Sequence, residues 1–303
     1  MEYIFSSLLP VFGLILLGYY FKRISFPSHE FWPMADKLTY FILMPSLLIH
    51  ELSKAKFQSE SLEFILSSLI AIFLTLLCLI IYNKIFPTKN SSFTSIVQGG
   101  IRFNTYVFLA LSGSIFGNVG LVLGAIILTF TIPILNILCI TIFALYSNNN
   151  KLDFKYLLKS IIKNPLIIGC FIGGSINFMS IPIPISIENL LQILGKAALP
   201  LGLLSIGYAL VLKDIHSVKK DLIISCIAKF IMLPIFIYMI GKAFDLNEMM
   251  ISILVLFAIL PTAPSSFILA RQLGGNIPLI TSIITVQTLL SALFIILFLK
   301  FFI

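Results

Sequence analysis

The chain has 303 residues, of which 59% are hydrophobic and 11% are charged. Soluble domains carry about 25% charged residues, so this composition excludes a soluble globular protein and indicates an integral membrane protein throughout. The net charge is +8, but the basic residues are scattered over short loops, so we expect contact with anionic lipid and no binding of nucleic acid.

Long apolar stretches follow one another along the whole chain. A hydrocarbon core of about 30 Å requires roughly 20 apolar residues per helix, and ten stretches approach this length. The pattern therefore predicts an all-α integral membrane protein with ten transmembrane helices. They run near 3–21, 31–50, 62–85, 93–115, 119–146, 165–178, 186–212, 221–243, 248–270 and 277–302. The sixth is short and rich in glycine, which is typical of close contact between helices.

The loops after the odd-numbered spans hold most of the basic residues, among them Lys22, Arg23, Lys84, Lys89 and Arg271. The positive-inside rule places these loops in the cytoplasm, so both termini are expected on the extracellular or periplasmic side. The longest connection, 147–164, has apolar residues at helical spacing beside lysines. This pattern predicts an amphipathic helix on the inner membrane surface.

The two halves of the chain show signs of an internal repeat, 1–146 and 165–303, joined by the linker 147–164. Three residues recur 155 positions later and one pair recurs 158 positions later: Pro10, Gly18 and Pro45 as Pro165, Gly173 and Pro200, and Gly117-Asn118 as Gly275-Asn276. Each half holds five spans, so the second half must enter the membrane inverted. Inverted repeats of this kind are characteristic of secondary transporters.

Two of the apolar spans contain polar breaks. Residues 99–105 read Gly-Gly-Ile-Arg-Phe-Asn-Thr, and residues 261–266 read Pro-Thr-Ala-Pro-Ser-Ser. Irregular backbone inside a bilayer is tolerated only where it is buried in protein or lines a wet cavity, and an Arg at mid-helix costs about 2.5–3.5 kcal/mol. The offset of 158 aligns Phe103 with Pro261. We therefore expect the broken fourth and ninth helices to cross near the midplane, with half-helix N-termini that favour a carboxylate.

The candidate substrate-binding residues are Asn104, Thr105, Ser46, Pro261, Thr262, Ser265 and Arg102. Asn104, Arg102 and the hydroxyl residues Thr105, Thr262 and Ser265 each have an alternative role. Hydroxyls in membrane helices often bond to their own backbone, and Asn104 can instead join two helices. Arg102 can hold a backbone carbonyl or a lipid phosphate in place of an anionic substrate.

Three further residues are candidates for coupling transport to an ion: His50, Gln287 and Asn136. His50 can titrate near neutral pH, or it can be an interfacial histidine. Gln287 and Asn136 can line an ion site, or they can hold helices together through hydrogen bonds. Lys196 and Lys229 lie deep in their spans and are interpreted as satisfied structural charges.

Signatures of an enzyme are absent from the sequence. The three histidines are far apart, and no glycine-rich phosphate-binding loop is found. The four cysteines lie in apolar runs without metal-ligand spacing. We therefore expect no enzyme activity, no cofactor and no metal, while coupling to H⁺ or Na⁺ remains open.

Several of these motifs resemble the auxin efflux carrier family, which includes bacterial malonate-carrier-like proteins and the plant PIN-type carriers. The motifs are Arg102-Phe103-Asn104-Thr105 leading to Phe116-Gly117, the segment 261–274 with Ala270-Arg271, Gln287-Thr288-Leu289-Leu290-Ser291, and Tyr40 to Pro45 followed by His50. The similarity covers essentially the whole chain. One departure is the second proline of the ninth-helix break, Pro264, which follows Pro261 by three residues where plant carriers have five.

The resemblance implies a ten-helix fold like those of sodium/proton antiporters and bile-acid symporters. Helices 1, 2, 6 and 7 would form a scaffold, and helices 3–5 and 8–10 a mobile transport domain. It also implies that Asn104 contacts a substrate carboxylate at the crossing, where Pro261 breaks the ninth helix. The long cytoplasmic loop of many plant members is missing, and a homodimer through the scaffold is implied by the resemblance alone.

The sequence therefore predicts a secondary transporter of a small organic anion in the cell membrane, working by elevator-type alternating access. A sodium-coupled symporter of the bile-acid type is the alternative within transport. A membrane sensor that binds a solute without moving it is the alternative from another class.

Overall fold

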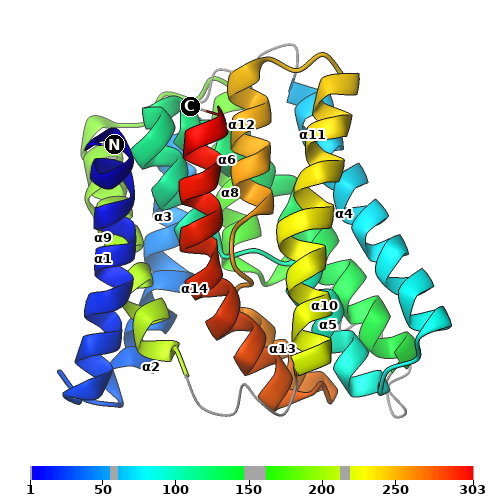
Figure 1. Cartoon of the computed structure of the whole chain (residues 1–303). Coiled ribbons are helices and arrows are strands. Elements are labelled where there is room, and N and C mark those ends of the chain that lie inside the picture. The colour runs from blue at the N-terminus through cyan, green and yellow to red at the C-terminus, as the bar shows by residue number, and fades with distance from the viewer. Residues whose placement is uncertain (1, 55–60, 147–161, 212–218, 303) are drawn as a thin grey trace. The chain divides into compact units, whose positions relative to one another are not determined.

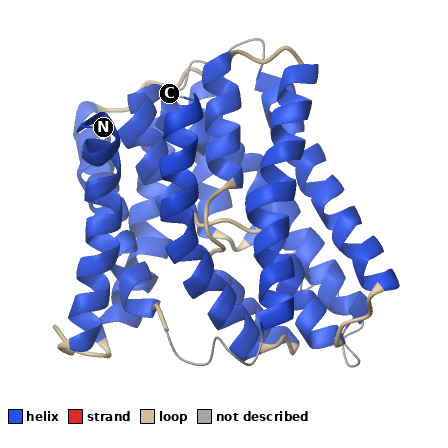
Figure 2. Cartoon of the chain, in the orientation of Figure 1, coloured by secondary structure: helices blue, strands red, loops and turns tan. Residues whose placement is uncertain are grey.

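The computed structural model describes residues 2–54, 61–146, 162–211 and 219–302. Within these ranges every regular element is a helix and no strand occurs, so the predicted all-α class is confirmed (Figure 2). The helices of the first half are α1 (Glu2–Arg23), α2 (Phe31–Leu38), η1 (Thr39–Leu43), α3 (Met44–Ser53), α4 (Ser61–Ile85), α5 (Asn90–Ile101) and α6 (Thr105–Tyr146). Those of the second half are α8 (Pro165–Phe178), α9 (Ile185–Ala209), α10 (Lys219–Ile227), η3 (Ala228–Met232), α11 (Leu233–Ala243), α12 (Glu248–Ala258), α13 (Ser265–Leu273) and α14 (Ile277–Phe302). The short elements η1 and η3 are π-helical.

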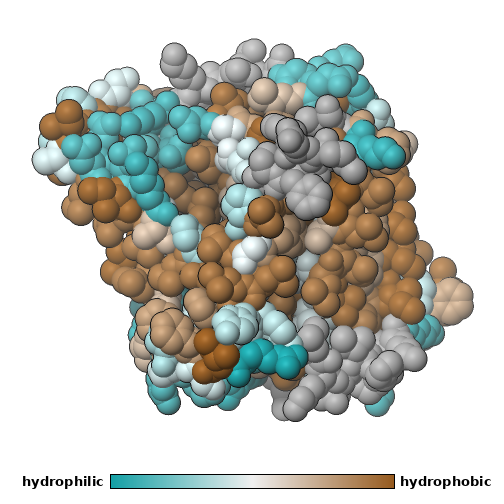
Figure 3. All heavy atoms as spheres, turned by 60° about the vertical axis from the view of Figure 1, so that its left-hand side comes forward, coloured by the Kyte–Doolittle hydropathy of each residue, from teal (hydrophilic) through white to brown (hydrophobic). Residues whose placement is uncertain are grey.

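Five helical segments of the described chain are long and apolar enough to cross a membrane: Leu62–Ile85, Asn90–Tyr146, Ile185–Ala209, Lys220–Ala243 and Ile277–Phe301. Two shorter apolar helices are Pro165–Phe178 and Glu248–Ala258. Large hydrophobic side chains are exposed on these helices, including Phe171, Phe178 and Ile193, and brown side chains cover much of the face in Figure 3. Such a surface is unfavourable in water and favourable against lipid tails.

The contacts divide the chain into two compact units. Unit 1 consists of 1–58, 109–133 and 158–209, and unit 2 consists of 59–108, 134–157 and 210–303. Unit 1 thus holds the predicted spans 1, 2, 6 and 7, which the resemblance assigns to a scaffold. It also includes 109–133, which the resemblance assigns to the mobile transport domain. The amphipathic helix predicted within 147–164 lies almost entirely outside the described residues.

In unit 1, several helices approach one another at backbone distance. Helices α1 and α9 lie side by side (Figure 1). A Cβ atom added to Gly207 would lie 1.8 Å from the Ile15 carbonyl oxygen, and one added to Gly18 would lie 2.0 Å from that of Leu204. Gly169 of the glycine-rich α8 meets Pro45 of α3 in the same way. Glycine is therefore required at these contacts, because any side chain would push the helices apart.

Unit 2 contains two interrupted helices. The backbone leaves helical geometry after Ile101, is extended at Arg102 (ψ 154°), and becomes helical again at Thr105. A second gap separates Ala258 from Ser265. Figure 2 shows both gaps as loops at mid-height among the helices. The irregular segments therefore fall where the sequence predicts polar breaks.

The predicted loop between the fourth and fifth spans is reduced to one residue. Gly117 has φ 62° and ψ −151°, and helix continues on both sides of it within α6. Residues with a Cβ atom rarely adopt this conformation, so a glycine allows the chain to change direction here without a longer loop.

Candidate functional site

The two gaps of unit 2 are in direct contact. We call residues 102–104 the first break, residues 259–264 the second break, and the two together the crossing. The backbone N–H of Asn104 donates a hydrogen bond of 2.8 Å to the carbonyl of Pro261. Both breaks lie within unit 2. The polar segments that interrupt two distant parts of the sequence therefore form one local structure.

Gln287 braces the crossing from α14. Its Oε1 accepts from the backbone N–H of Thr262 at 3.0 Å, and its Nε2 donates to the carbonyl of Gly99 at 3.0 Å. The Thr262 hydroxyl lies 2.7 Å from the same Oε1 and 3.0 Å from the Gly99 carbonyl oxygen. Nε2 is also 3.3 Å from the Ser225 hydroxyl of α10. Because Gln287 is fully buried, these bonds satisfy backbone groups that the breaks leave without helical partners.

Arg102 links the first break to two other elements. Its guanidinium donates to Asn136 Oδ1 of α6 at 3.2 Å and to the Ser265 hydroxyl, at the start of α13, at 3.1 Å. The side chain is half-buried, and none of the ion pairs among the described residues involves it. The structure therefore brings Arg102, Asn136 and Ser265 together and leaves a positive charge without a carboxylate partner. Sequence reasoning did not predict these partners.

Asn104 combines a capping role with an unpaired donor. Its Oδ1 accepts from the backbone N–H groups of Tyr106 at 3.1 Å and Val107 at 3.3 Å, which makes it the N-cap of α6. Its Nδ2 is buried and has no hydrogen-bond partner in the described chain. The residue is 1% exposed, so this amide has lost its contact with water without a replacement. Thr105 follows as the first residue of α6 and is half-buried.

Other buried polar atoms of unit 2 also lack partners among the described residues. They are both polar side-chain atoms of Gln98, the hydroxyl of Ser266, the Nζ of Lys229 and one carboxylate oxygen of Glu63, in the first turn of α4. Gln98 lies one turn before the first break, and its backbone carbonyl accepts a hydrogen bond from the Arg102 N–H. Ser266 lies in the first turn of α13. Buried polar groups are normally paired, so unpaired groups beside the crossing are expected where a polar ligand completes the structure.

An aromatic cluster covers one side of the crossing. The ring centroids of Phe103 and Phe257 are 4.4 Å apart, and both rings pack edge-to-face against Phe108. All three residues are buried. A wall of this kind excludes water and lowers the local dielectric, which strengthens every electrostatic interaction at the crossing.

The sequence interpretation of Lys229 is a satisfied structural charge, but among the described residues its amine has no hydrogen-bond partner. Its side chain is fully buried, and the only partner found for Nζ within the described residues is the face of Phe257, at 5.8 Å from the ring centroid. Lys196, in contrast, is exposed. The sequence shows that Lys229 lies deep in an apolar run, but it does not show that a counter-charge is missing.

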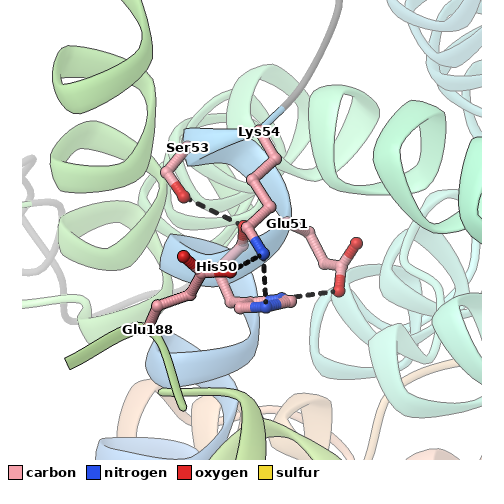
Figure 4. A network of polar contacts seen from close by, with 5 residues as sticks. All are labelled: His50, Glu51, Ser53, Lys54 and Glu188. Carbon is pink, nitrogen blue, oxygen red and sulfur yellow. Dashed lines mark hydrogen bonds and ion pairs between the residues drawn. The ribbon is translucent and has the colours of Figure 1, made fainter. Parts of the chain in front are cut away.

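Two of the predicted residues lie on α3 in unit 1. Ser46 donates to the carbonyl of Ile42 at 2.8 Å, so its hydroxyl is used by its own helix. His50 belongs to a polar network with Glu51, Lys54 and Glu188 (Figure 4). Its Nδ1 lies 3.0 Å from Glu51 and its Nε2 lies 3.2 Å from Lys54 Nζ, while Lys54 also bonds to Glu188 of α9. Both ring nitrogens of His50 are therefore paired.

The comparisons with known proteins point to membrane transport. Residues 150–299 match the family described as "Membrane transport protein". A protein of Rhizobium meliloti (strain 1021), named as a proposed malonate transporter, is 25% identical over 320 aligned residues, covering 98% of this chain and 97% of its own. An uncharacterized transporter of Methanocaldococcus jannaschii is 25% identical over 298 residues, covering 92% of each chain. The chain is thus a multi-pass membrane transport protein, its residues 150–299 are similar to this family, and the predicted resemblance to the auxin efflux carriers is confirmed.

Proposed function

We propose that the chain is a secondary transporter of a small organic anion, and that the carboxylate of the anion binds at the crossing. The observation that carries this proposal is the buried, unpaired amide of Asn104, two residues from Arg102, whose charge no carboxylate of the described residues pairs with. An amide N–H₂ and a guanidinium are both donors, and a carboxylate is an acceptor that can satisfy both.

The backbone at the crossing favours the same class of ligand. Helix α6 begins directly after Asn104, and α13 begins at Ser265, whose hydroxyl accepts from Arg102. The N-terminus of a helix carries partial positive charge, which favours an anion. Two such ends and Arg102 therefore create a positive potential, and no acidic side chain of the described residues forms an ion pair with Arg102. The positive potential favours an anion over a cationic solute.

The similar protein from Rhizobium meliloti is named for malonate, which is a small dicarboxylate. Two further unpaired donors, the side-chain amide of Gln98 and the hydroxyl of Ser266, belong to residues that flank the two breaks in the sequence. A ligand with two carboxylates can use more of these donors than a ligand with one. We therefore propose that dicarboxylates are bound in preference to monocarboxylates.

We further propose an elevator-type mechanism, in which unit 2 moves as the transport domain and unit 1 serves as the scaffold. Every bond described at the crossing joins residues of unit 2, so the site keeps its geometry without help from unit 1. The equivalent offsets of the two breaks in the sequence support two inverted five-helix repeats. The chain would lie in the cell membrane with both termini outside, as the distribution of basic residues favours.

The test is a thermal-shift measurement on the purified protein with malonate, with and without sodium. A ligand that binds only the folded state stabilises it by about 2.7 kcal/mol at 100 times its dissociation constant. We expect malonate to raise the apparent melting temperature of the wild-type protein. We expect no such rise for Asn104→Asp, which keeps the oxygen that caps α6 but replaces the donor by a negative charge.

The matched control is Asn247→Asp, because Asn247 is also a helix N-cap but is exposed at the opposite end of α12. This variant should respond to malonate like the wild type. A full malonate shift in Asn104→Asp would contradict the proposed site. A shift that requires sodium would favour the sodium-coupled symporter.

A further inference from the structure

Lys229 is a fully buried charge-bearing side chain of unit 2 whose Nζ has no hydrogen-bond partner among the described residues. It lies in η3, a single π-helical segment, and Pro234 follows in the first turn of α11. Proline lacks the N–H that a regular helix needs, and single π-turns inside helices are frequent at functional sites. The sequence thus sets Lys229 on an irregular turn in the interior of the unit, where its side chain is fully buried.

No counter-charge within the described residues reaches Lys229. It is packed by α4, α5, α10 and α11, and Phe257 of α12 and Phe294 of α14 also contact this region. Helix α5 has no charged residue, and the charged residues of the others lie in their first or last turns: Glu63, Lys84, Lys219, Lys220, Asp221, Lys242, Glu248 and Lys300. The remaining titratable side chains on these helices are Cys78, Tyr82, Cys226 and Tyr238. None of these groups forms an ion pair or hydrogen bond with the Lys229 amine.

Lys229 lies close to the crossing. Its Nζ is 5.8 Å from the centroid of Phe257, and that ring is 4.4 Å from the ring of Phe103, between Arg102 and Asn104. The preceding residue, Ala228, lies against Gly100, where an added Cβ would be 3.1 Å away from the Ala228 Cβ. The packed rings of Phe257 and Phe103 therefore connect the amine to the first break, and because these residues are buried, the charges there are poorly screened by water.

We propose that Lys229 is the proton-coupling residue of this transporter. An ammonium buried without a counter-charge is unfavourable, so the amine of the empty protein is neutral. A dicarboxylate at the crossing supplies the missing negative charge, and the amine then takes one proton from the aqueous phase to become an ammonium. When the anion leaves, the ammonium returns the proton. The inference rests on the proposed function, because it needs an anion at the crossing.

The charges balance in this scheme. In the empty protein Arg102 carries one positive charge and Lys229 carries none. In the loaded protein Arg102 and protonated Lys229 carry two positive charges, which match the two negative charges of a dicarboxylate dianion. One proton therefore travels with each dianion, and the loaded crossing is electrically neutral. A neutral site crosses a low-dielectric barrier far more easily than a charged one.

The test is isothermal titration of the protein with malonate at mildly alkaline pH, in two buffers that differ in their heat of ionisation. The difference between the two heats gives the number of protons taken up per malonate. We expect about one proton for the wild-type protein. Lys229→Met should bind malonate roughly tenfold more weakly and take up no proton. Lys229→Arg should retain binding and take up no proton, because a guanidinium is always protonated.

The control is Lys220→Met, which removes an exposed lysine near the start of α10 and should behave like the wild type. Wild-type binding of malonate without proton uptake would overturn the inference and leave the proposed function standing. Proton uptake that persists in Lys229→Arg would overturn it equally. If no carboxylate binds the wild-type protein, the inference and the proposed function both fall.

Discussion

Two polar clusters of this protein differ in how completely they are paired. At the end of α3, His50 bonds to Glu51 and Lys54, and Lys54 bonds to Glu188 of α9 (Figure 4). At the crossing, the buried Asn104 Nδ2 has no partner among the described residues, and neither have the buried side chains of Gln98 and Ser266, which flank the breaks in the sequence. The first cluster is complete as it stands and ties two helices together. The second is what a binding site requires before its ligand arrives, because the ligand must find donors that the protein has not already used.

The backbone around the two clusters also differs, because the helices are continuous near one cluster and broken near the other. In unit 1, α1 and α9 are uninterrupted and meet at glycines such as Gly18 and Gly207, so backbone packs directly on backbone. In unit 2, α5 and α12 stop inside the unit, and side chains such as Gln287 replace the lost helical bonds. Glycine contacts hold helices together without polar groups, whereas broken helices expose polar backbone. A scaffold needs the former, and a site for a charged solute needs the latter.

The largest effect is expected for Gln287→Leu. This change leaves the buried N–H of Thr262 without a partner and removes a donor from the Gly99 carbonyl. Each unsatisfied buried group costs about 1–3 kcal/mol, so we expect the free energy of unfolding to fall by about 3 kcal/mol. Thermal unfolding of the purified variant measures this loss. Gln192→Leu, at an exposed position of α9, is the control and should unfold like the wild type. Equal stability of the two variants would show that Gln287 does not brace the breaks.

The breaks themselves could be predicted from the sequence, because glycine, proline and polar residues within an apolar run are a local signal. Helix boundaries were predictable for the same reason: α4 covers Ser61–Ile85 where 62–85 was expected, and α14 covers Ile277–Phe302 where 277–302 was expected. A strong contrast in hydropathy decides where a membrane helix runs, and this contrast is readable residue by residue.

The pairing of the polar side chains could not be predicted. The two partners of Arg102 are 34 and 163 residues away, and nothing local marks them. Lys229 was interpreted as a satisfied charge, although it has no polar partner among the described residues. The sequence shows how deep a lysine lies in an apolar run. Whether a carboxylate reaches it depends on the packing of distant helices, and so does the π-helical turn on which it lies.

An intermediate effect is expected for Arg102→Lys. Lysine keeps the positive charge but cannot reach Asn136 and Ser265 at once with a planar fork. We expect the dissociation constant for malonate to rise about tenfold, which corresponds to about 1.4 kcal/mol. Titration calorimetry measures this change. Arg271→Lys, at an exposed position in the last turn of α13, is the matched control and should bind malonate normally. Unchanged affinity in Arg102→Lys would mean that charge alone, without the two fixed bonds, is sufficient.

The smallest effect is expected for Lys54→Met in unit 1. The change removes the bonds of Lys54 to His50 and to Glu188, but the ion pair is partly exposed and is screened by water and salt. We expect little change in thermal stability, less at high salt than at low salt, and no change in the affinity for malonate. A double-mutant cycle with Glu188→Gln measures the pair itself, free of other effects of each substitution.

Lys54→Met tests the contrast between the two clusters more strictly than Gln287→Leu or Arg102→Lys. We predict that the charged network around His50 has no part in binding malonate. If Lys54→Met weakened malonate binding as strongly as Arg102→Lys, the pairing within α3 and α9 would be coupled to the crossing. His50 would then return as a coupling residue, and proton uptake would have to be measured in His50→Gln beside Lys229→Arg. If affinity is unchanged, the complete cluster is structural, and the incomplete cluster alone binds the anion.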